Sequence, residues 1–356
     1  MPNQQSFTQQ RATAQLQFIR AALRDLPDCC AAFIRAIEPT TTTLTRSAYV
    51  RDLSLFIGFL IKEIPIFADK NPILINDSDL NAVTADHIAV FYEYLTLYIR
   101  DDQKELSNQE LSKMRKLSSL RSFFNFMFRN GRIDRNVAQL IDLPKIHEKP
   151  ILRLEIDEMA RMLDIADSGE LLTDRQKQWH NHTRLRDLAM LTLFLGTGIR
   201  VSECVGIDID DIDFELNGFL VTRKGGNQVI LYFPDEVADV LKNYIKERIQ
   251  IEALPGHEHA LFLSMQKRRI TIRAVELMVK KYAALAAPLK RKISPHKLRS
   301  TFGTNLYHST GDIYLVADVL GHSDVNTTRK HYAAMSDDRR RMAARAVKLR
   351  DDDADE

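Results

Sequence analysis

The amino-acid sequence predicts a mainly α-helical protein of two domains, with a small antiparallel β-sheet in the C-terminal domain. Three observations support this fold class. The chain has 356 residues and is 45% hydrophobic, which is enough for two domains that each bury a core. Apolar residues recur at helical spacing over most of the chain. Apolar and β-branched runs on both sides of a glycine-containing turn stand out in one segment, residues 218–233.

Helices are expected throughout the first domain, which we assign to residues 1–145. Apolar spacing predicts a helix over residues 49–60, and the hydroxyls of the threonine-rich run at 40–45 are good N-terminal caps. Two further helices are expected over residues 86–99 and 108–129. The apolar face of the last helix should consist of Leu117, Leu120, Phe124, Met127 and Phe128. Basic residues off that face predict a basic edge made of Lys113, Arg115, Lys116 and Arg121.

A linker is expected at residues 146–154, because two prolines bracket charged residues there and the helical period is lost. The second domain then spans residues 155–356. Its expected helices are residues 155–165, 185–195, 235–249, 272–284 and 313–320. Residues 218–233 predict a β-hairpin that turns at Lys224 to Asn227. Residues 164–184 are expected to form a polar loop, and the acidic tail at 351–356 to be solvated.

Composition excludes several classes of protein. The 50 Lys and Arg residues nearly balance the 48 Asp and Glu residues, so the net charge of +2 does not by itself indicate a nucleic-acid partner. The cysteines Cys29, Cys30 and Cys204 are too few for a disulfide framework and fit a reducing cytoplasm. The N-terminus lacks the pattern of a leader, and apolar stretches such as residues 189–195 are too short to span a membrane. We therefore expect a cytoplasmic protein.

Basic residues are concentrated locally in the second domain. Residues 267–299 contain eleven Lys or Arg residues and a single acidic residue, Glu276. This composition suits a surface that faces phosphates, but a solvated helix face has the same composition. The charge run alone leaves both interpretations open.

Six residues with chemically useful side chains follow one another through the second domain. They are Arg200 in GTGIRVSE, Lys224 in TRKGGNQ, His296 and Arg299 in HKLRSTFGTNL, His322 in LGHSD and Tyr332 in TTRKHYAAM. Each has an ordinary structural explanation when it is considered alone, such as an ion pair for Arg200 or a turn for Lys224. In this order and in these local contexts, the six together resemble the tyrosine recombinase, or phage integrase, family. The chain looks most like the Xer branch, especially its single-recombinase XerS type.

The resemblance implies a helical, SAM-like core-binding domain and a tyrosine recombinase catalytic domain, which together form a clamp around duplex DNA. It implies that Tyr332 is the nucleophile and that Lys224 protonates the leaving oxygen. It also implies that His322 binds the scissile phosphate, while Arg200 and Arg299 stabilise the transition state.

The chemistry of these side chains agrees with those roles. A phenol can store the phosphodiester as a phosphotyrosine, and guanidinium groups stay charged at any working pH while they bind phosphoryl oxygens through paired donors. Removing one such group typically costs about 2–4 kcal/mol in the transition state. An imidazole such as that of His296 can exchange a proton with the phenol. Glu203 is expected to support the arginines by orienting them, and the reaction needs no metal and no energy cofactor.

The resemblance also implies a double-stranded DNA partner with a specific recombination site. Candidate phosphate or groove contacts are Lys113, Arg115, Lys116, Arg121, Arg223, Lys267, Arg268, Arg269 and Arg273. The C-terminal segment 337–350 is amphipathic, and such a helix docks on a neighbouring protomer in the family. We therefore expect a homotetramer on two DNA sites, associated with the nucleoid. A regulatory partner protein is not identified by the sequence.

Three functions fit these residues. They are Xer-like chromosome dimer resolution, movement of a mobile genetic element by an integrase or transposase, and architectural DNA binding without catalysis. The six intact residues argue against the third. His180 and His182 have a spacing found in metal sites, but no cluster of Cys, Asp or Glu completes one. Gly196-Thr197-Gly198 lacks the GKS/T ending of a phosphate-binding loop.

Overall fold

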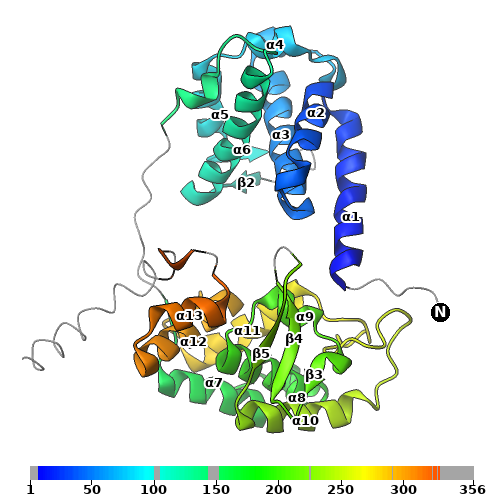
Figure 1. The fold of residues 1–356 in the computed structure, drawn as a ribbon, viewed down its shortest axis with the longest axis vertical. Helices are drawn as coiled ribbons and strands as arrows, with labels where there is room; N and C mark the ends of the chain where they lie inside the picture. The colour runs from blue at the N-terminus through cyan, green and yellow to red at the C-terminus, as the bar shows by residue number, and fades with distance from the viewer. Residues whose placement is uncertain are drawn as a thin grey trace, which may run out of the picture. The chain divides into compact units, whose positions relative to one another are not determined.

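The computed structural model describes residues 7–99, 105–142, 152–223, 226–290, 292–322, 324–326 and 328. The chain divides into two compact units between Lys149 and Pro150, which lies within the segment expected to be the linker. Helices dominate both units; the first contains a two-stranded antiparallel sheet and the second a three-stranded one (Figure 1). The predicted fold class, mainly α with a small C-terminal antiparallel sheet, is confirmed.

The first unit is built around a long central helix. Its helices and strands are α1 (Phe7–Ala22), α2 (Asp28–Ala36), α3 (Thr43–Glu63), α4 (Asp77–Asn81), α5 (Ala85–Tyr94), β1 (Leu97–Ile99), β2 (Glu105–Ser107) and α6 (Glu110–Arg129), with short 3₁₀ turns between several of them. Helix α3 contacts α1, α2 and α6. The expected helix at 49–60 lies inside α3, and the hydroxyl of Thr42 caps α3 by accepting from the amide of Thr45 at 3.3 Å, as the threonine run predicted.

Aromatic side chains fill the core of the first unit. Phe56 on α3, Phe91 on α5 and Phe124 on α6 are fully buried. The ring of Phe56 lies 5.1 Å from that of Phe91 and 6.0 Å from that of Phe124, nearly perpendicular to both. Such edge-to-face pairs each add about 0.5–1.5 kcal/mol beyond the burial of apolar area. These contacts hold α5 and α6 against α3.

Two predictions for the first unit are wrong, and the first concerns residues 86–99. The helix expected over 86–99 ends at Tyr94, and Leu97–Ile99 forms strand β1 paired antiparallel with Glu105–Ser107. A strand this short depends on a partner later in the chain, which local periodicity does not reveal.

The expected faces of α6 also differ from the structure. Phe128 is 47% exposed, whereas Lys113 and Lys116 are buried. The aliphatic stems of the two lysines are buried, and their ammonium groups form hydrogen bonds. Lys113 donates to Thr96 at 2.9 Å, and Lys116 donates to Asn108 at 2.7 Å. The basic edge expected on this helix is therefore only partly exposed.

The second unit contains the residues in the family-like motifs. Its helices and strands are α7 (Ile156–Ser168), α8 (Asp174–Thr197), α9 (Val201–Gly206), β3 (Ile212–Asp213), β4 (Gly218–Thr222), β5 (Gln228–Tyr232), α10 (Asp235–Arg248), α11 (Ile272–Ala286), α12 (Pro295–Thr310) and α13 (Ile313–Leu320). Helix α8 contacts α7, α10 and α12, so it is the central helix of this unit (Figure 1). Helices α7, α10, α11 and α13 match the predicted ranges to within a few residues, whereas α12 was not among the expected helices.

The predicted β-hairpin is confirmed. Strands β3, β4 and β5 form an antiparallel sheet in that order, and β4 pairs with β5 from Gly218 opposite Tyr232 to Thr222 opposite Gln228. Phe219 and Leu231 face the core on the same side of the pair. The register places the turn at residues 223–227, as its glycines and asparagine predicted.

The polar loop expected at 164–184 is wrong. Helix α7 continues to Ser168, Gly169 ends it with a φ of +72°, and α8 begins at Asp174. His180 is buried on α8, with its ring against Gly169 and its Nε2 3.4 Å from the carbonyl oxygen of Asp167. His180 therefore packs the α7–α8 turn rather than belonging to a polar loop.

A buried charge cluster joins α8 to α11. Asp187 is 2% exposed, and its carboxylate accepts from Arg186 at 2.7 Å, from Tyr282 at 3.1 Å and from Lys281 at 3.4 Å. Burial raises the pKa of Tyr282 and lowers the pKa of Lys281. Since a buried carboxylate is tolerated only when several donors surround it, this cluster fixes the packing of the two helices.

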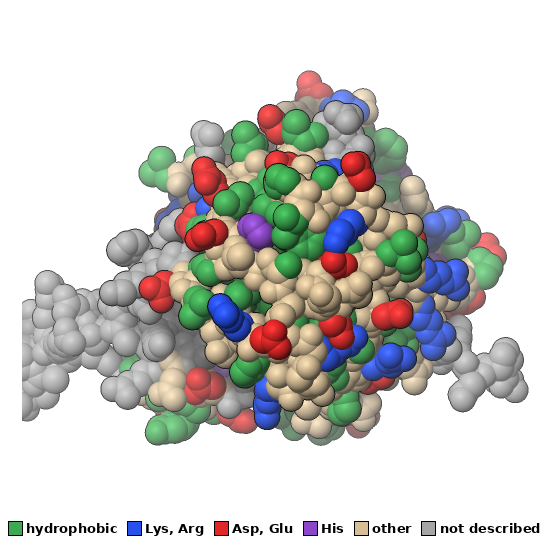
Figure 2. Space-filling view, turned by 90° about the horizontal axis from the view of Figure 1, so that it is seen from above, with side chains coloured by type: hydrophobic (Ala, Val, Ile, Leu, Met, Phe, Trp, Pro, Cys, Tyr) green, Lys and Arg blue, Asp and Glu red, His purple; other side chains and the backbone are tan. Residues whose placement is uncertain are grey.

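Within the described ranges, no helix is both long enough and apolar enough to cross a bilayer. On the face shown in Figure 2, acidic and basic side chains are interspersed, and Lys and Arg side chains gather toward one edge of the view.

Candidate active site

Arg200 stands at the start of α9, where the chain turns sharply after α8. Gly198 ends α8 with a φ of +63°, and its missing side chain leaves room for the ring of Phe302. Arg200 is the N-cap residue of α9, and its amide donates to Oε2 of Glu203 at 3.0 Å. Its guanidinium donates to the other oxygen of Glu203 at 2.7 Å. The buried carboxylate of Glu203 thus holds Arg200 by backbone and side chain together.

Arg299 lies on the buried face of α12. The residue is only 5% exposed. Its Nη1 donates to the carbonyl oxygen of Gly198 at 2.6 Å, and its Nη2 donates to the carbonyl oxygen of Leu320. One guanidinium therefore connects the turn before Arg200 with the end of α13.

His322 follows directly on the C-terminal turn of α13. Gly321 has a φ of +59°, and the amide of His322 donates back to the carbonyl of Ala317 at 2.9 Å, which is the pattern of a Schellman cap. The ring Nδ1 of His322 lies 2.7 Å from the hydroxyl oxygen of Thr328. The guanidinium of Arg200 donates to the carbonyl of Gly321 at 2.7 Å. Arg200, Arg299 and His322 therefore converge on a single turn, although the first two are 99 positions apart in the sequence.

His296 lies one helical turn before Arg299 on α12. It occupies the second position of that helix, after Pro295, and it is exposed. The spacing of three residues places the two side chains on neighbouring positions of the helix surface. Lys224 and Tyr332 lie outside the described residues.

At the turn after α13, three positively charged arginines meet backbone carbonyls that carry partial negative charge. The last carbonyls of a helix carry partial negative charge and have no partner within the helix, so they attract cations. Here Arg200 and Arg299 are joined by Arg223, which donates to the carbonyl of Val319 at 2.8 Å. Burial lowers the pKa of Arg223, and the nearby charge of Glu203 opposes that effect.

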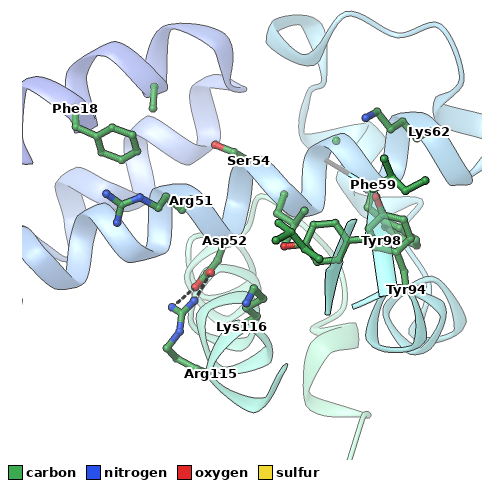
Figure 3. Close-up of a pocket in the computed structure, with 15 residues that line it drawn as sticks. Phe18, Arg51, Asp52, Ser54, Phe59, Lys62, Tyr94, Tyr98, Arg115 and Lys116 are labelled. Carbon is green, nitrogen blue, oxygen red and sulfur yellow. Dashed lines mark hydrogen bonds and ion pairs between the residues drawn. The ribbon is translucent and has the colours of Figure 1, made fainter. Parts of the chain in front are cut away.

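The four basic residues predicted on α6 are all engaged within the first unit. Arg115 forms a two-pronged ion pair with Asp52, with both N–O distances at 2.6 Å, and Arg121 donates to the carbonyl of Ala138 at 3.1 Å. Arg115 and Lys116 line a cavity of about 500 Å³, together with aromatic residues that include Tyr94 (Figure 3). Of the four predicted residues, Lys113 and Lys116 are thus buried, whereas Arg115 and Arg121 are at least partly exposed to solvent.

The basic residues predicted around 267–273 also differ in their surroundings. Arg269 donates to the carbonyls of Val205 and Ile207, both at 3.0 Å, and pairs with Asp208, so it braces the end of α9. Lys267 and Arg268 are exposed. Arg273 is exposed as well and lies 3.2 Å from Glu276 on its own helix. Only part of this charge run is therefore exposed to solvent.

Sequence reasoning missed two glycines that shape the site. Gly198 and Gly321 both adopt the left-handed conformation next to the arginines. A side chain at Gly321 would overlap the guanidinium of Arg223, because an added Cβ would lie 2.1 Å from its Nη1. For Gly321 the available signal was its place directly after the apolar helical run 313–320, because a glycine there commonly ends a helix. Gly198 lacks that signal, because Gly196 and Thr197 precede it.

Comparison with known proteins identifies the family. The model of the phage integrase family matches residues 153–339. Tyrosine recombinase XerC of Caldanaerobacter subterraneus is 33% identical over 301 residues, which cover 83% of this chain and 78% of the relative. Tyrosine recombinase XerC of Chlorobaculum tepidum is 29% identical over 334 residues, which cover 89% of this chain and 93% of the relative.

Solved structures share the fold. The XerH site-specific recombinase bound to a palindromic difH substrate matches with a TM-score of 0.61 and 19% identity, over 92% of this chain and 93% of that one. The Tn1549 transposon integrase in complex with circular intermediate DNA matches with a TM-score of 0.59 and 19% identity, over 89% and 98%. With the convergence of Arg200, Arg299 and His322, these comparisons show that the chain belongs to the phage integrase family and is a tyrosine recombinase, an enzyme that cleaves and rejoins DNA at specific sites.

Proposed function

We propose that this recombinase acts on duplex DNA at one chromosomal site, as an Xer-type enzyme that resolves chromosome dimers, and that Tyr332 is its nucleophile. The observation that carries the proposal is the meeting of Arg200, Arg299 and His322 at the C-terminal turn of α13. Two guanidiniums from distant segments at one point are an arrangement suited to a phosphoryl group. The XerC relatives support the Xer assignment.

The proposed reaction is a transesterification in which no bond energy is lost. The phenolic oxygen of Tyr332 attacks the scissile phosphorus, and its proton passes to His296. The bond from phosphorus to the 5′ oxygen breaks, and Lys224 donates a proton to that oxygen as it leaves. Arg200, Arg299 and His322 hold the non-bridging oxygens of the phosphorane. Attack by a 5′ hydroxyl of the other DNA duplex reverses these steps and joins new strands.

We propose that both units contact the DNA. Phosphate contacts would supply most of the affinity, so binding should weaken steeply as the salt concentration rises. Exposed cations such as Lys267, Arg268 and Arg273 are the proposed contacts with the best access to solvent. We propose that four protomers assemble on two sites through exchange of segment 337–350, which lies outside the described residues, and that the protein works on the nucleoid.

A second candidate is movement of a mobile genetic element. The observation that favours it is the likeness in fold to the Tn1549 transposon integrase, which is nearly as close as the likeness to XerH. The chemistry would be the same, so only the DNA site distinguishes the two. Architectural binding without catalysis is disfavoured by the intact series of residues from Arg200 to Tyr332.

Selection of the DNA site tests the proposal. The protein is mixed with a library of genomic duplex fragments that contain nicks, and fragments that remain attached to protein after denaturation are sequenced. Tyr332→Phe is the matched control, because it removes only the phenolic hydroxyl. We expect one chromosomal locus, captured by the native protein and not by the variant. Capture of the two ends of a mobile element would favour the second candidate, and equal capture by the variant would refute the assignment of Tyr332.

A further inference from the structure

Arg223 joins the β-hairpin to the end of α13. It follows β4 directly, at the point where the hairpin turns. Its Nη2 donates to the carbonyl of Val319 at 2.8 Å, and its Nη1 donates to the carbonyl of Asp318 at 3.3 Å. Both carbonyls belong to the last turn of α13, three and four residues before His322. One side chain therefore links two elements that carry separate parts of the proposed catalytic machinery.

The contact between Arg223 and α13 is closely fitted. The guanidinium lies against Gly321, where an added Cβ would come within 2.1 Å of Nη1. Only glycine leaves this space, and only a planar fork reaches two successive carbonyls. Within the part of the chain that the structure describes, the Nε of Arg223 is buried and has no hydrogen-bond partner. Binding of a DNA phosphate by this Nε is the alternative role for Arg223, and the test below separates the two roles.

The two elements joined by Arg223 depend on it unequally. The turn of α13 has other support, because the amides of Gly321 and His322 bond back into the helix and Arg200 binds the carbonyl of Gly321. In the hairpin turn, the amide of Arg223 bonds only within the turn, to the carbonyl of Asn227 at 2.8 Å. Loss of the guanidinium should therefore loosen the tip of the hairpin, while the paired strands stay packed through Phe219 and Leu231 and α13 stays in place.

We propose that Arg223 is a positioning residue that fixes the hairpin against the turn of His322 and thereby sets the place of Lys224, its neighbour in the sequence. The proposal rests on the proposed function, in which Lys224 protonates the leaving oxygen. Arg223 makes no bond to the reacting atoms and adds no step to the reaction. Its effect should be confined to the stage that Lys224 serves, since a displacement of about 1 Å can cost about 100-fold in rate.

The test compares two leaving groups. Suicide duplexes are built on the site that the genomic selection recovers, with either the ordinary 5′ oxygen or sulfur at the scissile bond, since a thiolate leaves without a proton. Arg223→Met should cleave the oxygen substrate about 10- to 100-fold more slowly and the sulfur substrate less than about threefold more slowly. Arg223→Lys keeps the positive charge but not the planar pair of donors. Its cleavage rate on the oxygen substrate should lie between those of the native protein and Arg223→Met. The double variant Arg223→Met, Lys224→Ala should cleave the oxygen substrate no more slowly than Lys224→Ala alone.

Controls separate the outcomes. Arg184→Met, in which a half-exposed arginine loses its pair with Asp167, should leave both rates unchanged. Amide hydrogen exchange of the free protein should quicken at residues 226–228 in Arg223→Met but not at 317–322. Equal loss on both substrates, or weaker DNA binding with an unchanged ratio between them, would overturn the role of Arg223. If sulfur fails to rescue Lys224→Ala, the acid role of Lys224 in the proposed function falls as well.

Discussion

Replacement of Arg299 by Met should destabilise the second unit and leave the first unit unaffected. Arg299 is buried, and its charged donors satisfy the carbonyls of Gly198 and Leu320. Each buried acceptor left without a donor costs about 1–3 kcal/mol, so the two together predict a loss of about 2–6 kcal/mol in the free energy of unfolding. Methionine retains most of the apolar stem, so the loss reports mainly on the guanidinium.

Amide hydrogen exchange of the full chain measures this loss unit by unit, because protected amides in α8 and α12 report opening of the second unit. The amides of α3 and α6 serve as an internal reference, since the first unit has a separate aromatic core. Arg184→Met is the matched control and should change the free energy by less than about 1 kcal/mol, as is usual for an exposed ion pair. A change below about 1 kcal/mol in Arg299→Met, or an equal change in both units, would refute the bracing role of Arg299.

Two further predictions concern buried groups of the second unit. Burial raises the pKa of Tyr244 from 10.0 to about 12. The unfolded chain therefore loses this proton first, and about 2–3 kcal/mol of stability should disappear as the pH rises from 10 to 12. Urea titrations should show that the free energy of unfolding of Tyr244→Phe does not fall by this amount between pH 10 and 12. The same dependence on pH in the variant and the native protein would contradict the prediction. Asp187→Asn should cost about 2–4 kcal/mol, because Arg186 and Lys281 lose their carboxylate. Adding Lys281→Met should recover part of that cost, and no recovery would exclude an unpaired cation as its cause.

The sequence predicted best those elements whose signal is local and long. The apolar period of α3 and the turn residues between β4 and β5 each specify an element without reference to the rest of the chain. Strand β1 was mistaken for helix because Leu97–Ile99 becomes a strand only by pairing with residues 105–107. The start of α8 was missed because its first turns are polar, and only the packing of His180 shows which side is buried.

The sequence singled out residues that the structure brings together at one turn, but it did not indicate their contacts. The order of Arg200, Arg299 and His322 indicated the chemistry, and the structure brings these three side chains to one turn. The same kind of reasoning did not identify which arginines serve the fold. In the structure Arg223 and Arg269 bind backbone carbonyls, as Arg200 and Arg299 do, so these bonds do not separate phosphate-binding arginines from those that serve only the fold. A guanidinium suits either kind of oxygen, so its partner depends on tertiary structure that no local pattern specifies.

The central claim is that a tyrosine near the C-terminus becomes esterified to DNA while Arg200 and Arg299 hold the phosphate. Its most direct test is peptide mapping of the covalent adduct formed on a suicide duplex. The reaction is stopped by denaturation, the DNA is trimmed by nuclease, and the peptides are analysed by mass spectrometry. We expect the remaining nucleotide on the peptide that contains Tyr332, joined through a 3′ phosphate. A nucleotide on another side chain, or an adduct that persists in Tyr332→Phe, would contradict the account.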